Sequence, residues 1–236
     1  MAPAISTVAA IGLALGIRHA FEPDHLAVVS TLATRQASPL AAARLGLVWA
    51  AGHTASLGVV VLAVILTGVR LPAALWPVAD LLVGALLVVL GGSVLYRYGR
   101  GAWHLHAHAH GPEQGSHLHL HSHSAGSAHE HRHPRGDVRR SLAFGLLHGL
   151  AGSAAILVLL VAAAPTRGMQ LAYFLAFGVG TGVGMLSVSL TLAGLVRAAS
   201  RQGVRWARAL HLGAAAASVV AGGALAATTV QQLLVR

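Results

Sequence analysis

The chain has 236 residues, of which 56% are hydrophobic and only 9% are charged. An average soluble domain carries roughly 25% charged residues, so this composition argues against a water-soluble fold. There is no cysteine, which excludes a disulfide framework and a thiolate metal site. The net charge of +10 is carried by arginine alone. The arginines lie mainly between apolar stretches, which indicates membrane orientation and not nucleic-acid binding.

Apolar stretches long enough to cross a lipid bilayer recur along the chain. A transmembrane helix needs roughly 18 or more mostly apolar residues. The segments that meet this requirement are 5–34, 45–69, 73–96, 141–164, 170–197 and 209–234. We therefore predict an all-α polytopic membrane protein of about six transmembrane helices. Residues 1–96 form its first three-helix half, 97–139 a long loop, and 140–236 its second half.

The arginines predict how these six spans are oriented. Twelve loop arginines fall on the side of residues 97–139, and the other side receives only Arg70, Arg167 and Arg236. Cytoplasmic loops carry the excess of basic residues. We therefore predict a multi-pass protein of the cell membrane, with residues 97–139 in the cytoplasm and both termini outside.

A short internal match suggests a repeat. Gly16-Ile17-Arg18-His19 aligns with Gly145-Leu146-Leu147-His148, and each is followed by a small-residue turn. With three spans per half, a repeat has to be inverted in the membrane. Either the match is fortuitous, or a 3+3 inverted repeat brings His19 and His148 together near the midplane.

The central loop contains two runs in which histidine alternates with another residue. Alternation is the period of a strand, and the Gly/Pro-containing connection at 111–116 predicts a β-hairpin. We expect pairs 104–123, 106–121, 108–119 and 110–117. The histidines that then share one face are His104, His106, His108, His110, His117, His119, His121 and His123.

A disordered histidine-rich linker is the alternative for this loop. In either form its imidazoles favour nickel, cobalt, zinc or copper. Because the loop lies outside the bilayer, we expect it to buffer ions or deliver them, for instance to a cytoplasmic metallochaperone.

The first span contains Arg18, His19, Glu22, Asp24 and His25 within eight residues. Ionisable residues inside a membrane are costly and usually mark a site or pathway. On a regular helix His19 and His25 would point about 120° apart. Proline disfavours helix continuation, so we predict a break around Pro23 that turns both toward one ion. Asp24 either ligates the metal or orients His25, and Glu22 is expected to pair with Arg18.

Two further histidines lie in other spans. His53 is the only ionisable residue of the second span, and it either completes the metal site or hydrogen-bonds a neighbouring helix. His148 lies in a glycine-rich stretch of the fourth span that allows close helix packing. The predicted metal site therefore consists of His19, Asp24, His25, His53 and His148.

These motifs resemble those of a known family. Arg18-His19-Ala20-Phe21-Glu22-Pro23-Asp24-His25 resembles the His-x4-Asp-His signature of the nickel/cobalt transporter superfamily. Gly52-His53-Thr54, the stretch from His148 to Ser153 and the histidine loop resemble its urease-accessory-H-like branch. The resemblance implies that His19, Asp24 and His25 recognise the metal, with His53 supporting them. The chain departs from the larger permeases in its six spans, and its Glu-Pro pair is similar to the efflux branch.

We therefore predict a secondary transporter that moves nickel or cobalt across the cytoplasmic membrane, with uptake favoured over efflux. The divalent ion is its cargo, and no prosthetic group is expected. A metal-binding accessory protein for metalloenzyme maturation is the alternative, but it leaves the cluster in the first span without a purpose. An enzyme is not expected, because an intramembrane metalloprotease would need a His-Glu-x-x-His pair, and no span contains one.

Overall fold

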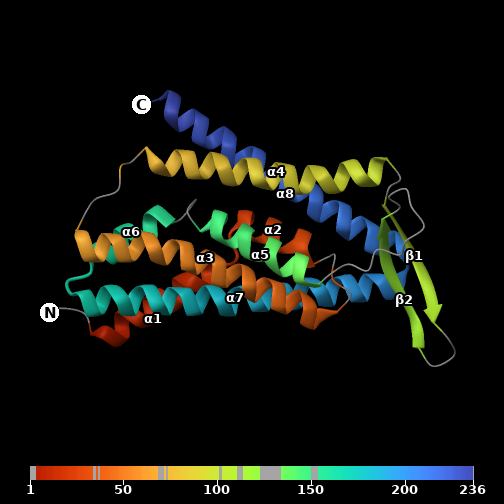
Figure 1. Cartoon of the computed structure of the whole chain (residues 1–236), viewed down its shortest axis with the longest axis horizontal. Helices are drawn as coiled ribbons and strands as arrows, with labels where there is room; N and C mark the ends of the chain where they lie inside the picture. Colours follow the sequence, from red (N-terminus) through yellow and green to blue (C-terminus); the bar gives the residue numbers. More distant parts are fainter. Residues whose placement is uncertain are drawn as a thin grey trace.

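The computed structural model describes residues 4–33, 36, 38–68, 72, 74–100, 103–110, 114–122, 134–149 and 154–235. Within these ranges the chain forms a helical bundle and one antiparallel hairpin. The elements are α1 (Ile5–His19), α2 (Pro23–Ala33), α3 (Pro39–Thr67), α4 (Leu75–Gly99), β1 (Trp103–His110), β2 (Gln114–Ser122), α5 (Pro134–His148), α6 (Ala154–Ala163), α7 (Arg167–Gln202) and α8 (Val204–Leu234). The long helices follow the long axis of the molecule, and the hairpin lies at one end (Figure 1).

The helical membrane core expected from the sequence is confirmed. Among the described residues, α3, α4, α7 and α8 are each long and apolar enough to cross a membrane. Helices α1 and α2 qualify as a fifth span if they are taken together, with a bend of 59° between them. Helices α5 and α6 have 15 and 10 residues, so neither crosses a bilayer alone.

Local chemistry explains where several helices begin and end. The Ser38 hydroxyl accepts a hydrogen bond from the Ala41 amide, and Pro39 occupies the first turn of α3. Gly68 ends α3 in the left-handed conformation with φ 67°. The Thr166 hydroxyl caps α7 in the same way through the Met169 amide.

Several helices extend beyond the predicted spans, because hydropathy detects the apolar part of a helix and misses its polar ends. Helix α3 begins at Pro39 instead of 45, and α8 begins at Val204 instead of 209. Helix α5 begins at Pro134, inside the segment predicted as the long loop. Helix α7 extends to Gln202.

The predicted break in the first span is present. Helix α1 ends at His19, the chain turns through Ala20–Glu22, and α2 begins at Pro23. Proline suits the first position of a helix because its missing N–H is not needed there. The segment predicted as one span at 141–164 is also divided, into α5 and α6, and this second break was not predicted.

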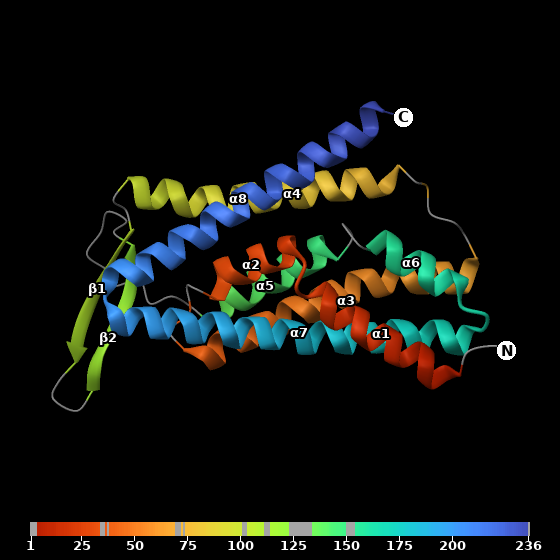
Figure 2. The same cartoon turned by 180° about the vertical axis from the view of Figure 1, so that it is seen from behind.

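The helices pack in three main pairs. Helix α1 lies against α7, α5 against α3, and α4 against α8 (Figure 2). Glycines allow the first two contacts. A Cβ atom on Gly16 would collide with the Phe177 carbonyl, and one on Gly145 would collide with the Trp49 carbonyl. Helix α1 of the first half therefore packs closely on α7 of the second half. Helix α5 of the second half packs in the same way on α3 of the first half.

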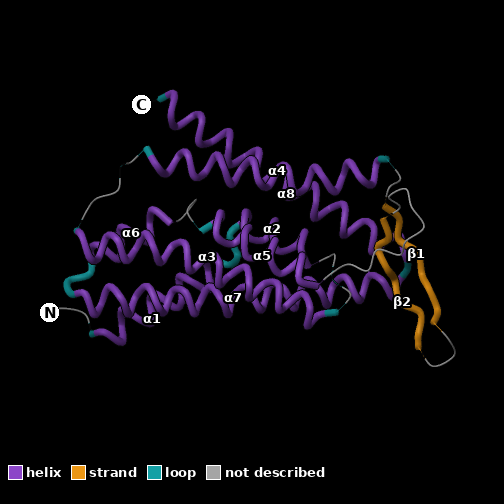
Figure 3. The backbone as a smooth tube through the Cα atoms, in the orientation of Figure 1, coloured by secondary structure: helices purple, strands orange, loops and turns teal. Residues whose placement is uncertain are grey.

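The β-hairpin predicted for the histidine loop is present, but its register differs from the prediction. Residue 104 pairs with 121, 106 with 119, 108 with 117, and 110 with 114. The predicted pairing is therefore wrong by two residues for the first three pairs. Strand β2 already begins at Gln114, inside the segment expected to turn, and an irregularity lies between His108 and His110. Figure 3 shows both strands beyond the ends of the helices.

Candidate metal centre

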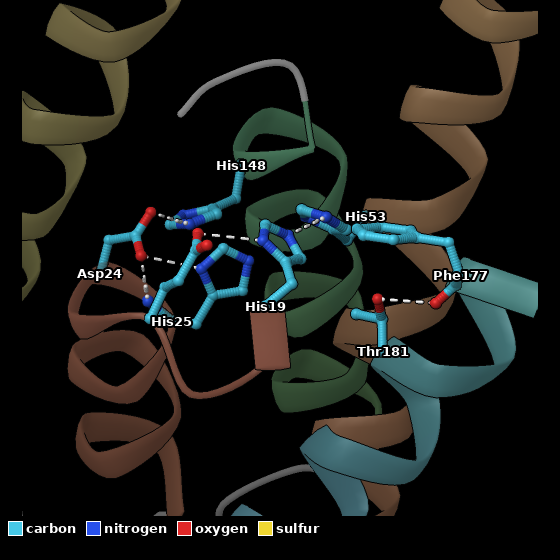
Figure 4. Close-up of polar contacts among 8 residues, drawn as sticks. His19, Asp24, His25, His53, His148, Phe177 and Thr181 are labelled. Carbon is cyan, nitrogen blue, oxygen red and sulfur yellow. Dashed lines mark hydrogen bonds and ion pairs between the residues drawn. The ribbon is translucent and has the colours of Figure 1, made fainter. Parts of the chain in front are cut away.

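Four buried histidines meet where the two broken helices end. His19 is the last residue of α1, His25 lies in the first turn of α2, His53 lies within α3, and His148 is the last residue of α5. Their exposed fractions are between 0 and 4%. Figure 4 shows them as one cluster with Asp24 at its edge. The break in the first span brings His19 and His25 together, with ring centroids 4.1 Å apart.

His19 connects the first break to α3. Its Nε2 lies 3.1 Å from the Nε2 of His53, and its Nδ1 lies 3.0 Å from a carboxylate oxygen of Glu22. Two nitrogens bound to one ion through bonds of about 2.1 Å lie about 3.0–3.4 Å apart. The spacing between the two Nε2 atoms is therefore compatible with a shared metal ion.

Asp24 connects the first break to the second. Its Oδ1 accepts hydrogen bonds of 2.9 Å from the backbone N–H and from the Nδ1 of His25. Its Oδ2 accepts a hydrogen bond of 3.1 Å from the Nε2 of His148. One carboxylate therefore holds imidazoles from α2 and α5, and its contact with His148 joins residues that are 124 positions apart in the sequence.

Two groups of side chains have ligand atoms close enough to hold one metal ion. One consists of His19, His25 and His53, and the other of Asp24, His25 and His148. In each group the atoms lie within 4.8 Å of one another. All five residues predicted from the sequence therefore lie at one locus, although they form two overlapping groups.

Aromatic rings enclose the cluster. Trp49 is fully buried, stacks on His53 with ring centroids 5.2 Å apart, and meets His25 edge-on at 5.1 Å. The Phe177 ring lies 5.1 Å from His19. These apolar walls lower the local dielectric, which strengthens electrostatic interactions at the centre.

Two neighbours of the site are not among the five predicted metal ligands. Glu22 was expected to pair with Arg18, and its carboxylate lies 3.0 Å from the Nδ1 of His19, which precedes it by three residues at the end of α1. Trp49 precedes His53 by four residues and shares its helical face. That spacing was the available signal for Trp49.

The loop histidines were predicted as a further metal-binding group. The backbone of β1 and β2 places seven of the predicted residues in the hairpin. His123 lies outside the described residues. Metal binding by this loop therefore stays a prediction.

Comparison with known proteins gives one relative. The chain is 32% identical over 199 residues to the urease accessory protein UreH of Bacillus sp. (strain TB-90), and the match covers 84% of this chain and 81% of UreH. No family model and no solved structure matches the chain.

Proposed function

The chain belongs to the family of the urease accessory protein UreH, and we propose that it is a secondary transporter that moves nickel or cobalt ions across the cytoplasmic membrane. The observation that carries the proposal is the buried cluster of four histidines and Asp24 where two broken helices end. Broken helices at membrane depth line substrate pathways in transporters.

The donor atoms support this choice of cargo. Imidazole nitrogens and carboxylate oxygens suit nickel and cobalt better than calcium or magnesium. The absence of cysteine removes the thiolates that soft metals prefer. The His-x4-Asp-His signature from His19 to His25 is that of the nickel/cobalt transporter superfamily.

We further propose six spans arranged as an inverted repeat. In this arrangement α1 with α2 forms the first span, and α5 with α6 forms the fourth. The packing supports it, because exchanging the halves converts the α1–α7 contact into the α5–α3 contact. The aligned glycines, Gly16 and Gly145, occupy equivalent places in these two contacts.

The hairpin suits a role in loading or delivery at the cytoplasmic face. Its backbone register pairs His104, His106 and His108 with His121, His119 and His117. Directly paired residues of two antiparallel strands have Cβ atoms roughly 5 Å apart, so the backbone register brings these histidines close together in pairs. A cytoplasmic metallochaperone is the partner proposed for this segment.

An accessory role without transport is the second candidate. The printed name of the relative and the histidine hairpin favour it. It does not account for a metal-compatible cluster that is buried among the helices. We therefore place transport first, with uptake favoured over efflux.

Metal accumulation in cells tests the proposal. Cells that lack their own nickel importer express the wild type, His25→Ala, or His211→Ala. His211 is also buried, but it lies on α8 beside Tyr98 and serves as the matched control. We expect higher nickel or cobalt content with the wild type and His211→Ala than with His25→Ala.

Each alternative gives a different result in this assay. Lower metal content with the wild type, restored by His25→Ala, establishes efflux. Equal content in all cells, with expression verified in membranes, contradicts transport in both directions and leaves the accessory role.

A further inference from the structure

His25 is the only residue shared by the two groups of potential ligands. Two ligand atoms on opposite sides of one ion are about 4.2 Å apart at most, given metal–nitrogen bonds of about 2.1 Å. The five residues do not form one group within even 4.8 Å. One stationary ion therefore cannot contact all five side chains in this arrangement.

The two ring nitrogens of His25 have different surroundings. Nδ1 is held by Asp24 on the side of His148. Nε2 is buried and makes no hydrogen bond within the described part of the chain. The His25 ring contacts His19 and His53 at centroid distances of 4.1 and 5.1 Å, and His148 at 4.5 Å. His25 is therefore placed to ligate an ion in either group.

We infer that the ion occupies two successive positions and that His25 holds it in both. The imidazole position is formed by His19, His25 and His53, and the carboxylate position by Asp24, His25 and His148. In moving between them, the ion exchanges the imidazoles of His19 and His53 for the Asp24 carboxylate and the His148 imidazole. The inference rests on the proposed function and specifies how the ion passes through the site.

The two positions face helices that come from opposite ends of the bundle. His19 ends α1, which starts at the end where both termini lie, and His148 ends α5, which starts near the hairpin (Figure 1). Transfer of the ion at His25 therefore connects His19, on the helix that comes from one end of the bundle, with His148, on the helix that comes from the other end. Because one side chain serves both positions, the ion stays beside a protein ligand during the exchange, which avoids a fully hydrated or ligand-free ion among apolar walls.

Cobalt binding to the purified protein tests the inference. The full chain carries serine at every loop histidine from His104 to His133, so that only the buried histidines compete for Co²⁺. His53→Ala removes a ligand of the imidazole position, and His148→Ala removes one of the carboxylate position. His25→Ala affects both positions, and His211→Ala is the control. Affinity comes from titration, and the ligand set from X-ray absorption at the cobalt edge.

We expect each single change at His53 or His148 to leave a usable position. His148→Ala should retain cobalt with imidazole ligands, and His53→Ala should retain it with a carboxylate oxygen in the ligand set. His25→Ala, and His53→Ala combined with His148→Ala, should lose more affinity than the roughly 10- to 100-fold typical of an outer-shell partner. Near-isosteric His53→Gln and His148→Gln replace any alanine variant that does not elute as a folded protein.

If the ion has a single binding position, the cobalt affinities and ligand sets of these variants should follow a different pattern. If His53→Ala and His148→Ala weaken cobalt binding equally and leave the same ligand set, the two-position inference is wrong. Transport distinguishes this failure from that of the proposed function. A protein that shows both ligand sets but moves no metal in cells contradicts transport alone, whereas a transporter with one ligand set contradicts the two positions alone.

Discussion

His19 and His25 each have a carboxylate oxygen within hydrogen-bond distance of one ring nitrogen. Each ring also lies close to another buried side chain. Glu22 lies at Nδ1 of His19, and Asp24 lies at Nδ1 of His25. In metal sites a carboxylate on the second nitrogen of a histidine fixes the tautomer and the ring orientation. In this arrangement Nε2 is the ring atom of each histidine that does not face these carboxylates. This arrangement gives Glu22 the role of positioning the His19 ring. Glu22 is not one of the residues that define the His-x4-Asp-His signature, so the signature does not indicate this role.

A substitution at Glu22 tests this role. We expect Glu22→Ala to weaken Ni²⁺ binding about 10- to 100-fold, since His19 loses the partner that fixes its Nδ1 proton. Glu22→Gln keeps an oxygen that accepts this hydrogen bond, so it should recover most of the affinity. Calorimetric titration of the purified protein measures both. Wild-type affinity in Glu22→Ala, or equal losses in both variants, would contradict the positioning role.

At the scale of single elements, the two broken spans differ in how well the sequence predicts them. The first break follows from local chemistry, because Pro23 cannot continue α1 and suits the first turn of α2. Around the second break, residues 135–164 contain no proline. Close packing of Gly145 on α3 accompanies that break, and such a long-range contact is not visible in a local pattern.

The sequence predicted which residues lie at the site better than it predicted which of them contact one another. His19, Asp24, His25, His53 and His148 stand out because polar residues are rare in apolar spans. Their division into two overlapping groups depends on angles between helices, which the sequence does not specify. The hairpin was predictable from alternation, but its register depends on where the turn forms, and the predicted turn was too long.

The contact between α1 and α7 gives a test at this scale. A Cβ atom on Gly16 meets backbone atoms of Phe177 and Thr181, which cannot move without shifting α7. Gly16→Ala should therefore destabilise the protein by about 1–3 kcal/mol, the usual cost of overpacking. This loss should appear even though alanine favours a helix over glycine by about 1 kcal/mol. Thermal unfolding in detergent, followed by tryptophan fluorescence, measures the change.

Gly92 on α4 provides the matched control. A Cβ atom there meets no atom within 4 Å, so Gly92→Ala gains helix propensity without a collision. Its melting temperature should equal or exceed that of the wild type. If Gly16→Ala has the same melting temperature as Gly92→Ala, close packing between α1 and α7 is not required for stability.

At the scale of the whole molecule, the distribution of arginines agrees with the positions of the hairpin and of the two termini. Helix α1 starts and α8 ends at the end of the bundle opposite the hairpin (Figure 1). The end of α7 and the start of α8 meet at Gly203 near the hairpin, and these helix ends carry four exposed arginines. These are Arg197, Arg201, Arg205 and Arg208. Since basic residues collect on the cytoplasmic side, this arrangement favours a cytoplasmic hairpin.

The absence of cysteine makes this topology directly testable, because the unmodified chain gives no background with thiol reagents. Single cysteines replace Ser122 on β2 and Gln202 at the end of α7, and, toward the opposite end, Ala74 before α4 and Leu234 at the end of α8. We expect a membrane-impermeant maleimide to label Ala74→Cys and Leu234→Cys in intact cells. Ser122→Cys and Gln202→Cys should react only after permeabilisation, because the bilayer separates the two ends. Labelling of Ser122→Cys in intact cells would reverse the orientation and place the histidine hairpin outside, where it could not load a cytoplasmic partner. Labelling of only one of Ala74→Cys and Leu234→Cys would leave an odd number of crossings between them and would contradict the six-span arrangement.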